Sequence, residues 1–316
     1  MNVVPLISVL IPVYNVELFV FDAVNSICNQ TYDNLEIIVV DDCSSDNTYD
    51  VVAELAKNDK RIKLYRNSKN LKIADTLNFA LTKVTGEFVA RMDGDDFSES
   101  TKIEKQYLFL KNNPEYALVG TNYILEDEFG NEISRTNYLK DFSKTSKILR
   151  FESPVAHIWL TTKNIYDEIG EYRMPGVEDY DFLLRLVSAG YKISNLEDYL
   201  YVVRSRSGNT ISTMGLKQRK STEFTYKLFK ERCSNNSNLD SYTISNYNSE
   251  TSVSERKLLQ FQKSTEYYNL CLKYRKASFL KSFFFLLLSI YNSPSNQLKY
   301  LYKRFRLKII KKYASW

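Results

Sequence analysis

The 316-residue sequence predicts an α/β protein in which helices flank a mostly parallel central sheet, with a helical region at the C-terminal end. Short β-branched apolar runs alternate with amphipathic stretches, as expected for parallel strands joined by crossover helices. From residue 255 onward, apolar residues recur at helical spacing among many basic and aromatic side chains. Apolar residues make up 44% of the chain, so a substantial core can be buried.

Four runs are expected to form the parallel strands, at residues 7–11, 36–40, 62–65 and 88–92. A helix is expected over 46–57, because capping-type residues Ser44, Ser45 and Asp46 precede an apolar helical face. After about residue 115 the expected elements are shorter, with a turn at 127–131 and helices near 143–150 and 179–189.

A boundary is expected in residues 233–254, where twelve of 22 residues are Ser or Asn, a composition typical of linkers. We therefore predict one large domain over residues 1–232, with halves at about 1–115 and 116–232. The segment 233–254 would be a linker, and 255–316 a basic, aromatic helical region.

Charge is unevenly distributed along the chain. The net charge is +5, yet residues 255–316 hold 14 Lys/Arg and only 2 Asp/Glu, which leaves the preceding part acidic. A basic, aromatic tail on an acidic body favours an anionic membrane surface as partner. No recognised nucleic-acid-binding motif accompanies the charge, so no nucleic-acid partner is expected.

The cysteines and the N-terminus indicate a cytoplasmic protein. The chain has four scattered cysteines and one histidine, so neither a disulfide framework nor a zinc site is predicted. The first residues lack a basic leader and a small-residue cleavage site, so no signal peptide is expected.

Two acidic clusters follow expected strands, and therefore belong at the ligand-binding edge of the sheet. In the first, residues 39–46, a carboxylate could accept hydrogen bonds from a nucleoside, and a helix-capping loop is an equally good reading. In the second, residues 91–96, Asp93, Asp95 and Asp96 repel one another unless a cation neutralises them. Oxygen ligands favour Mg²⁺ or Mn²⁺, and Gly94 would let the backbone approach a ligand closely.

A third acidic segment, residues 177–186, opens an amphipathic helix. Acidic residues there are also ordinary at a helix N-terminus. A carboxylate that converged on the metal site could deprotonate a substrate hydroxyl.

These motifs occur in the order of a known family. The chain over residues 5–213 closely resembles the inverting family 2 glycosyltransferases, which have the GT-A (nucleotide-diphospho-sugar transferase) fold. The motifs that carry the resemblance are ISVLIPVYN at 7–15, QTY at 30–32, the Asp41-Asp42 loop, TGEFVARMDGDD at 85–96 and EDYD at 178–181. It implies a nucleotide-binding half, about 1–115, and an acceptor-binding half, about 116–232.

The resemblance also implies roles for individual residues. Asp95 and Asp96, with Asp93, correspond to the metal-binding DxD motif. Asp179 is similar in place to the family's general base, and Glu178 to the residue that supports it or contacts acceptor. Donor-binding positions would be Pro12, Tyr14, Asn15, Asp42, Arg91 and Asp93.

Three departures from the family pattern matter. Lys72 stands where glycine is usual, so either the loop bends differently, or the ammonium reaches a phosphate, or the lysine is simply exposed. Arg206 stands where many relatives have histidine; it could bind diphosphate but not a metal. The Gln-x-x-Arg-Trp signature of processive synthases is absent, so one sugar per encounter is expected.

His157 and the tail are interpreted with open alternatives. The resemblance puts His157 beside the acceptor site, although a lone histidine is more often a structural hydrogen-bonding residue than a catalytic one. The apolar run 283–291 is too short to cross a bilayer, which needs about 20 residues. The helix expected downstream could lie in a membrane interface, pack on the body or form a homodimer.

The sequence thus predicts a metal-dependent, inverting hexosyltransferase that moves one sugar from a nucleotide-sugar, UDP-linked by preference, to a lipid-linked or oligosaccharide acceptor. Capsule or O-antigen assembly at the inner face of the cell membrane is the expected setting. The alternatives are a transferase that loads a lipid phosphate carrier, and a nucleotide-sugar-binding pseudoenzyme without turnover.

Overall fold

The computed structural model describes residues 4–205 and 210–314. The chain divides into two compact units, which we describe separately. Unit 1 comprises Met1–Thr213 and Thr225–Ser241, and unit 2 comprises Met214–Phe224 and Tyr242–Trp316.

The core of unit 1 is a nine-stranded sheet whose main path has the order β3-β2-β1-β4-β8-β6-β9-β5, with β7 paired to β6. The first four strands in sequence order are parallel to one another: β1 (Ile7–Val13), β2 (Leu35–Asp41), β3 (Ile62–Arg66) and β4 (Phe88–Arg91). Every residue of β1 and β2 is buried, as expected for parallel strands covered on both faces. The predicted α/β class and its four parallel strands are confirmed.

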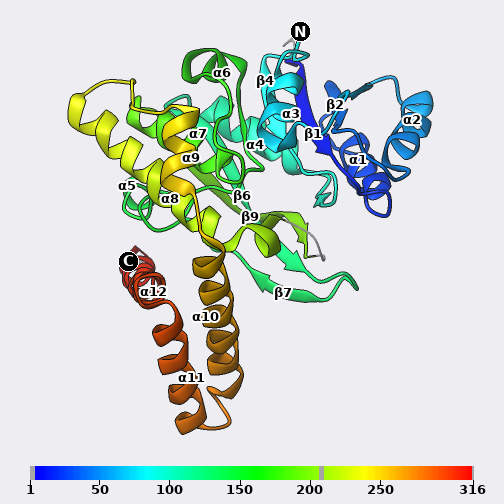
Figure 1. Ribbon diagram of the computed structural model, residues 1–316. Helices are drawn as coiled ribbons and strands as arrows, with labels where there is room; N and C mark the ends of the chain where they lie inside the picture. The colour runs from blue at the N-terminus through cyan, green and yellow to red at the C-terminus, as the bar shows by residue number, and fades with distance from the viewer. Residues whose placement is uncertain (1–3, 206–209, 315–316) are drawn as a thin grey trace. The chain divides into compact units, whose positions relative to one another are not determined.

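Helices cover both faces of this sheet (Figure 1). Because side chains alternate along a strand, Ile7, Val9 and Ile11 join one apolar cluster and Leu10 joins the other. The first cluster includes residues of α1 (Val20–Cys28), α2 (Thr48–Asn58) and α4 (Lys102–Asn112). The second includes residues of α3 (Lys72–Leu81), α6 (Lys163–Ile169) and α7 (Glu178–Ser188).

The second half of unit 1 adds the mixed part of the sheet. Its strands are β5 (Phe97–Ser98), β6 (Tyr116–Glu126), β7 (Glu132–Arg135), β8 (Leu160–Thr162) and β9 (Lys192–Arg204). The predicted turn at 127–131 joins β6 to β7, where the Asp127 carboxylate accepts hydrogen bonds from the backbone N–H groups of Phe129 and Asn131. The helix expected near 143–150 is a shorter α5 (Phe142–Thr145).

The C-terminal part is helical, as predicted, but its division differs from the predicted boundaries. Its elements are α8 (Thr210–Asn235), interrupted at Gly215, α9 (Ile244–Thr251), α10 (Glu255–Tyr274), α11 (Phe279–Asn292) and α12 (Pro294–Ala314). The expected linker 233–254 contains α9, whose Tyr247 is buried against Phe224 within unit 2. Ser/Asn composition reports local polarity, and it cannot show that one tyrosine in such a segment has a packing partner.

No described helix is long and apolar enough to span a bilayer.

Candidate active site

The loops that follow β1, β2 and β3 hold residues with strained backbone. Asn15, Cys43 and Lys72 have φ values of 50°, 63° and 72°, in the left-handed region that non-glycine residues rarely adopt. The Asn15 side chain accepts a hydrogen bond from the Ser45 N–H at 2.9 Å, so the loops after β1 and β2 are tied together. Such strain persists where the surrounding structure enforces it, and it clusters at functional sites.

Asp42 orders the loop that leads into α3. Its buried carboxylate accepts hydrogen bonds from Asn67 Nδ2 at 2.8 Å and from the N–H groups of Leu71 and Lys72 at 2.7 and 2.9 Å. Lys72 therefore takes the backbone conformation that a glycine would take, and its side chain is exposed. Contact of this lysine with a phosphate stays a prediction.

The other predicted donor-binding residues at this edge of the sheet differ in their exposure to solvent. Pro12 is buried within β1, whereas the Tyr14 ring is 45% exposed. Arg206 lies outside the described residues.

Gly94 lets the acidic loop, residues 91–96, approach β1 closely. A Cβ atom at this position would lie 2.5 Å from Val13 Cγ1 and 3.2 Å from the Pro12 carbonyl oxygen. Glycine at this position thus allows a close approach to the neighbouring strand, and the expected approach to a ligand stays a prediction.

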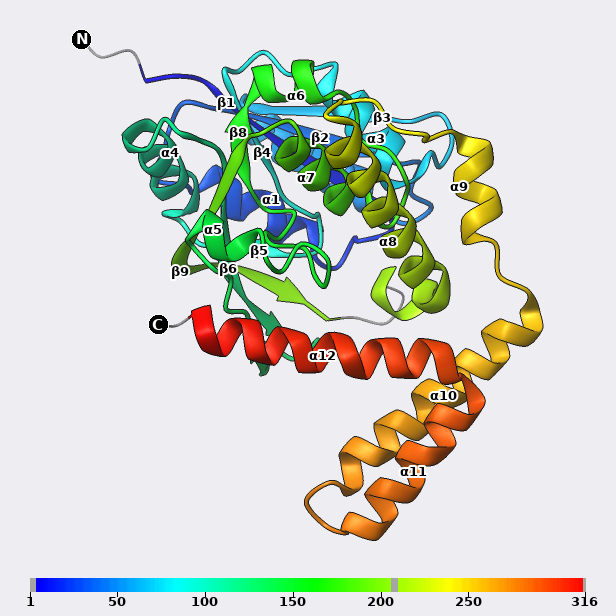
Figure 2. The ribbon, with the colours of Figure 1, turned by 90° about the vertical axis from the view of Figure 1, so that its left-hand side faces the viewer.

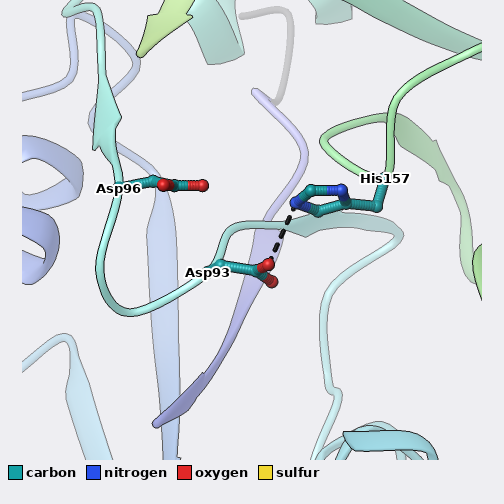
Figure 3. A group of neighbouring side chains, drawn as sticks. All are labelled: Asp93, Asp96 and His157. Carbon is teal, nitrogen blue, oxygen red and sulfur yellow. Dashed lines mark ion pairs between the residues drawn. The ribbon is translucent and has the colours of Figure 1, made fainter. Parts of the chain in front are cut away.

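The acidic loop brings two of its carboxylates together with the chain's histidine (Figure 3). Asp93 Oδ2 lies 3.1 Å from His157 Nε2, and one potential ligand atom from each of Asp93, Asp96 and His157 falls within 4.8 Å of the others. Asp95, the third member of the predicted metal set, is not part of this group. A carboxylate–imidazole cluster of this size has the donor atoms that a divalent cation requires.

The charges in this cluster are coupled. Burial raises the pKa of Asp96 to about 8, and the neighbouring carboxylates of Asp95 and Asp93 add to the effect. Burial acts in the same direction on Asp93, but His157 and Arg91 beside it hold the pKa of Asp93 well below its usual range. Burial disfavours the imidazolium of His157, yet the contact with Asp93 raises the pKa of His157 overall. Asp96 thus keeps its proton at neutral pH unless another cation replaces it.

Arg91 links the acidic loop to α7. Its side chain is 3% exposed, and its Nη2 atom lies 3.3 Å from Asp93 Oδ1 and 3.4 Å from Glu178 Oε1. The other carboxylate oxygen of Glu178, Oε2, accepts a hydrogen bond from the Gly176 N–H at 2.8 Å. Burial raises the pKa of Glu178, and the Arg91 charge opposes this rise. The sequence singled out Arg91 and Glu178 separately, and the structure pairs them.

Asp179 is half-buried in the first turn of α7. It directly follows Glu178, which pairs with Arg91, and its charge contributes to the raised pKa of both Arg91 and His157. The third acidic residue of that turn, Asp181, turns away from the site: its buried carboxylate binds Arg173 and Arg185.

Two residues behind the acidic loop were not identified from the sequence. The Tyr201 hydroxyl on β9 accepts a hydrogen bond from the Asp93 N–H at 3.1 Å. Lys102, at the start of α4, is fully buried with its Nζ 5.7 Å from the centre of the Tyr201 ring, and burial lowers the pKa of Lys102 to about 7. Neither residue belongs to a motif, so no local signal could have found them.

Comparison with known proteins identifies the family of this chain. The family model described as "Glycosyl transferase family 2" matches residues 8–169. A Bacillus subtilis (strain 168) protein with the provisional name glycosyltransferase EpsE is 34% identical over 213 residues, covering 66% of this chain and 76% of that protein. The O-antigen biosynthesis glycosyltransferase WbnJ of Escherichia coli is 30% identical over 217 residues, covering 66% and 84% respectively.

Solved structures share the fold at low sequence identity. TarS 1–349 from S. aureus, crystallised with UDP-GlcNAc, matches with a TM-score of 0.61 and 19% identity over 98% of this chain and 89% of that one. This chain spans 54% of a longer TarS structure. The mannosyltransferase PcManGT from Pyrobaculum calidifontis, in complex with GDP-Man and Mn²⁺, matches with a TM-score of 0.58 and 16% identity over 100% and 88%. The expected GT-A fold is confirmed, and the chain is a glycosyltransferase that belongs to glycosyl transferase family 2.

Proposed function

We propose that this enzyme transfers one sugar, with inversion, from a nucleotide-sugar to a hydroxyl of a lipid-linked or oligosaccharide acceptor in surface-polysaccharide assembly. The observation that carries the proposal is the cluster of Asp93, Asp96 and His157 beside the buried Arg91–Glu178 pair. It lies at the carboxyl ends of parallel strands, where such sheets bind nucleotides. WbnJ, named for O-antigen biosynthesis, supports the capsule or O-antigen setting, and TarS with UDP-GlcNAc supports a UDP-sugar.

A divalent cation, Mn²⁺ or Mg²⁺, fits the residues present. Asp93 and Asp96 would hold it, with His157 as a further nitrogen ligand and Asp95 as the remaining carboxylate of the motif. The raised pKa of Asp96 supports this assignment, because a buried carboxylate among others needs a positive partner. When bound, the cation supplies charge that stabilises a departing diphosphate.

The protein's own groups would divide the remaining work. Asp179 removes the proton from the attacking hydroxyl as general base. Arg91 keeps Asp93 ionised and holds Glu178 in place beside Asp179. His157 also remains a proposed acceptor-side residue, as the family resemblance implies. Pro12, Tyr14, Asn15, Asp42, Lys72 and Arg206 remain proposed donor contacts.

The test is a screen of UDP-, GDP- and dTDP-sugars for hydrolysis with Mn²⁺ or Mg²⁺. We expect one donor to be hydrolysed, the chelator EDTA to stop the reaction, and Asp96→Asn to remove most of the activity. Asp198→Asn, which changes an exposed carboxylate paired with Lys105, serves as the matched control and should keep full activity. Full-rate turnover in EDTA would exclude the metal, and no hydrolysis of any donor would favour a pseudoenzyme.

The proposal also covers the identity of the acceptor and the attachment of the enzyme to the membrane. Transfer to a lipid phosphate, in preference to a sugar hydroxyl, would identify the enzyme as one that loads a lipid carrier. We propose peripheral attachment to the cytoplasmic face of the membrane through residues 255–316, whose net positive charge suits anionic lipids.

A further inference from the structure

Helix α11 buries serines and exposes large apolar side chains, which is the reverse of a typical helix in a water-soluble protein. It packs along α10 (Figure 2), where the Phe285 ring stacks on Tyr267 and Tyr274 and buried serines make the polar contacts. The Ser264 hydroxyl on α10 donates to the Ser289 carbonyl oxygen at 2.7 Å, and the Ser289 hydroxyl donates back to the Ser264 carbonyl oxygen at 2.6 Å. About two turns before Ser289 on α11, the Ser282 hydroxyl donates to the Cys271 carbonyl oxygen at 2.9 Å. These three serines are buried.

The opposite side of α11 carries large apolar side chains that are 50–82% exposed: Phe279, Leu280, Phe283, Phe284, Leu287 and Tyr291. Their spacing puts them on one continuous face of the helix. A water-soluble amphipathic helix buries its large apolar residues and exposes its polar ones. Small residues and side-chain hydrogen bonds between helices, with large apolar residues outside, are instead typical of helices surrounded by lipid.

The charges of unit 2 indicate which surface receives this face. The chain contains no Asp or Glu after Glu266, and the turn from α10 to α11 carries exposed Arg275 and Lys276. A cavity of about 440 Å³ within unit 2 is lined by Arg275, Arg304 and Lys308 together with Tyr268, Leu301 and Phe305. No ion pair joins those three cations to a carboxylate of the described residues, and Arg304 Nη1 is held by the Tyr268 hydroxyl at 2.8 Å. Three cations and no carboxylate around one cavity suit a phosphate group.

We propose that unit 2 docks on an anionic bilayer, with the apolar face of α11 among the acyl chains and a lipid phosphate in the Arg275–Arg304–Lys308 cavity. With 14 residues, α11 extends about 21 Å, which is too short to cross, so it would lie in the interface. This proposal rests on the membrane attachment proposed above, and it is independent of the donor, the acceptor and the metal.

The experiment measures co-sedimentation of the full chain with vesicles of phosphatidylcholine, with or without phosphatidylglycerol. Wild-type protein should bind the phosphatidylglycerol vesicles, and added salt should weaken that binding. Phe284→Gln with Leu287→Gln should weaken binding at least tenfold. Arg304→Gln with Lys308→Gln should do the same, whereas the matched pair Arg256→Gln with Lys263→Gln, which removes equal charge from α10 outside the cavity, should cost only a few-fold.

Each part of the proposal can fail separately. Unchanged binding of the Phe284/Leu287 variant would exclude insertion of α11, and equal losses in the two charge variants would exclude the phosphate site. If light scattering without vesicles showed a dimer that the Phe284/Leu287 variant abolishes, the face would be an interface between two copies of this chain. Unfolding curves and donor hydrolysis of every variant show that unit 1 is intact, so a failed docking test leaves the proposed reaction untouched.

Discussion

At the scale of single residues, the buried guanidinium of Arg91 contacts two carboxylates of the site. Arg91 is the cation between Asp93, in the proposed metal cluster, and Glu178, next to the proposed base. A buried cation between two carboxylates keeps both oriented, because any rotation would leave a charge without a partner in a medium of low polarity. The proposed donor-side and acceptor-side groups are therefore joined through one side chain.

Asp179→Asn tests the division of labour between these groups. The amide keeps the shape of the side chain and loses its basicity, so transfer should fall by roughly two to four orders of magnitude, the range of general-base loss. Nucleotide affinity, measured by calorimetry in the presence of Mn²⁺, should stay near the wild-type value, because the base acts on the attacking hydroxyl. A parallel loss of nucleotide binding would make Asp179 a donor-site or structural residue.

At the scale of elements, a second buried carboxylate joins the strands of the parallel sheet. Glu36 on β2 accepts hydrogen bonds from the Ser8 hydroxyl on β1, from Thr85 and Gly86 before β4, and from Lys63 on β3. Burial alone would raise the pKa of Glu36, but these donors lower it from 4.5 to about 2. The ionised form is thus the one that the fold stabilises.

The sign of this shift predicts how stability depends on pH. Because the folded pKa of Glu36 is below its unfolded value, its contribution is complete above pH 4.5 and is lost as the pH falls towards 2. Glu36→Gln should lower the free energy of unfolding by roughly 3 kcal/mol at pH 7 and flatten its decline in acid. Urea unfolding at several pH values measures both effects. Glu54→Gln, at an exposed pair with Lys57, is the control and should change little; an equal loss in both variants would contradict the assignment.

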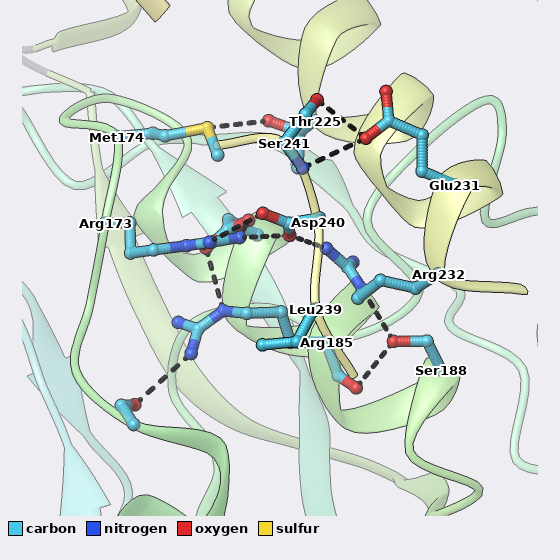
Figure 4. Close-up of polar contacts among 12 residues, drawn as sticks. Arg173, Met174, Arg185, Ser188, Thr225, Glu231, Arg232, Leu239, Asp240 and Ser241 are labelled. Atoms are coloured by element: carbon cyan, nitrogen blue, oxygen red, sulfur yellow. Dashed lines mark hydrogen bonds and ion pairs between the residues drawn. The ribbon is translucent and has the colours of Figure 1, made fainter. Parts of the chain in front are cut away.

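At the scale of the whole molecule, the chain leaves unit 1, contributes a segment to unit 2 and returns. A buried ionic network secures the returning segment, residues 225–241 (Figure 4). Asp240 binds Arg232 and also Arg173, at 3.0 Å, and Arg173 in turn binds Asp181 of α7. The helix that carries Glu178 and Asp179 is thereby linked to a segment far along the chain.

Asp240→Asn should destabilise unit 1 by about 3–5 kcal/mol, because it leaves the buried charge of Arg232 without its partner. Asp198→Asn removes an exposed carboxylate paired with Lys105, and should cost no more than about 1 kcal/mol. Thermal unfolding compares the two, and hydrogen exchange should show the loss of protection in residues 225–241 and α7. Similar melting temperatures for the two variants would show that the network contributes no net stability.

The sequence by itself determined the parts of this protein that depend on local pattern. Runs such as 36–40 predict buried parallel strands because β-branched apolar residues fill both faces of a covered sheet. The acidic residues after those strands could be assigned to the ligand-binding edge, because parallel strands end at the same side. The family, the fold and the helical C-terminal region followed from the same kind of pattern.

Only the tertiary structure decided which of these residues meet. Arg91 and Glu178 are 87 residues apart, and Asp93 and Tyr201 are 108 apart. His157 beside Asp93 and Asp96, and the return of Asp240 to unit 1, are likewise contacts between distant segments. Local periodicity reports the environment of a residue and not the identity of its neighbour. That identity is set by the order of the strands and by which helix covers which face, which only the packed molecule specifies.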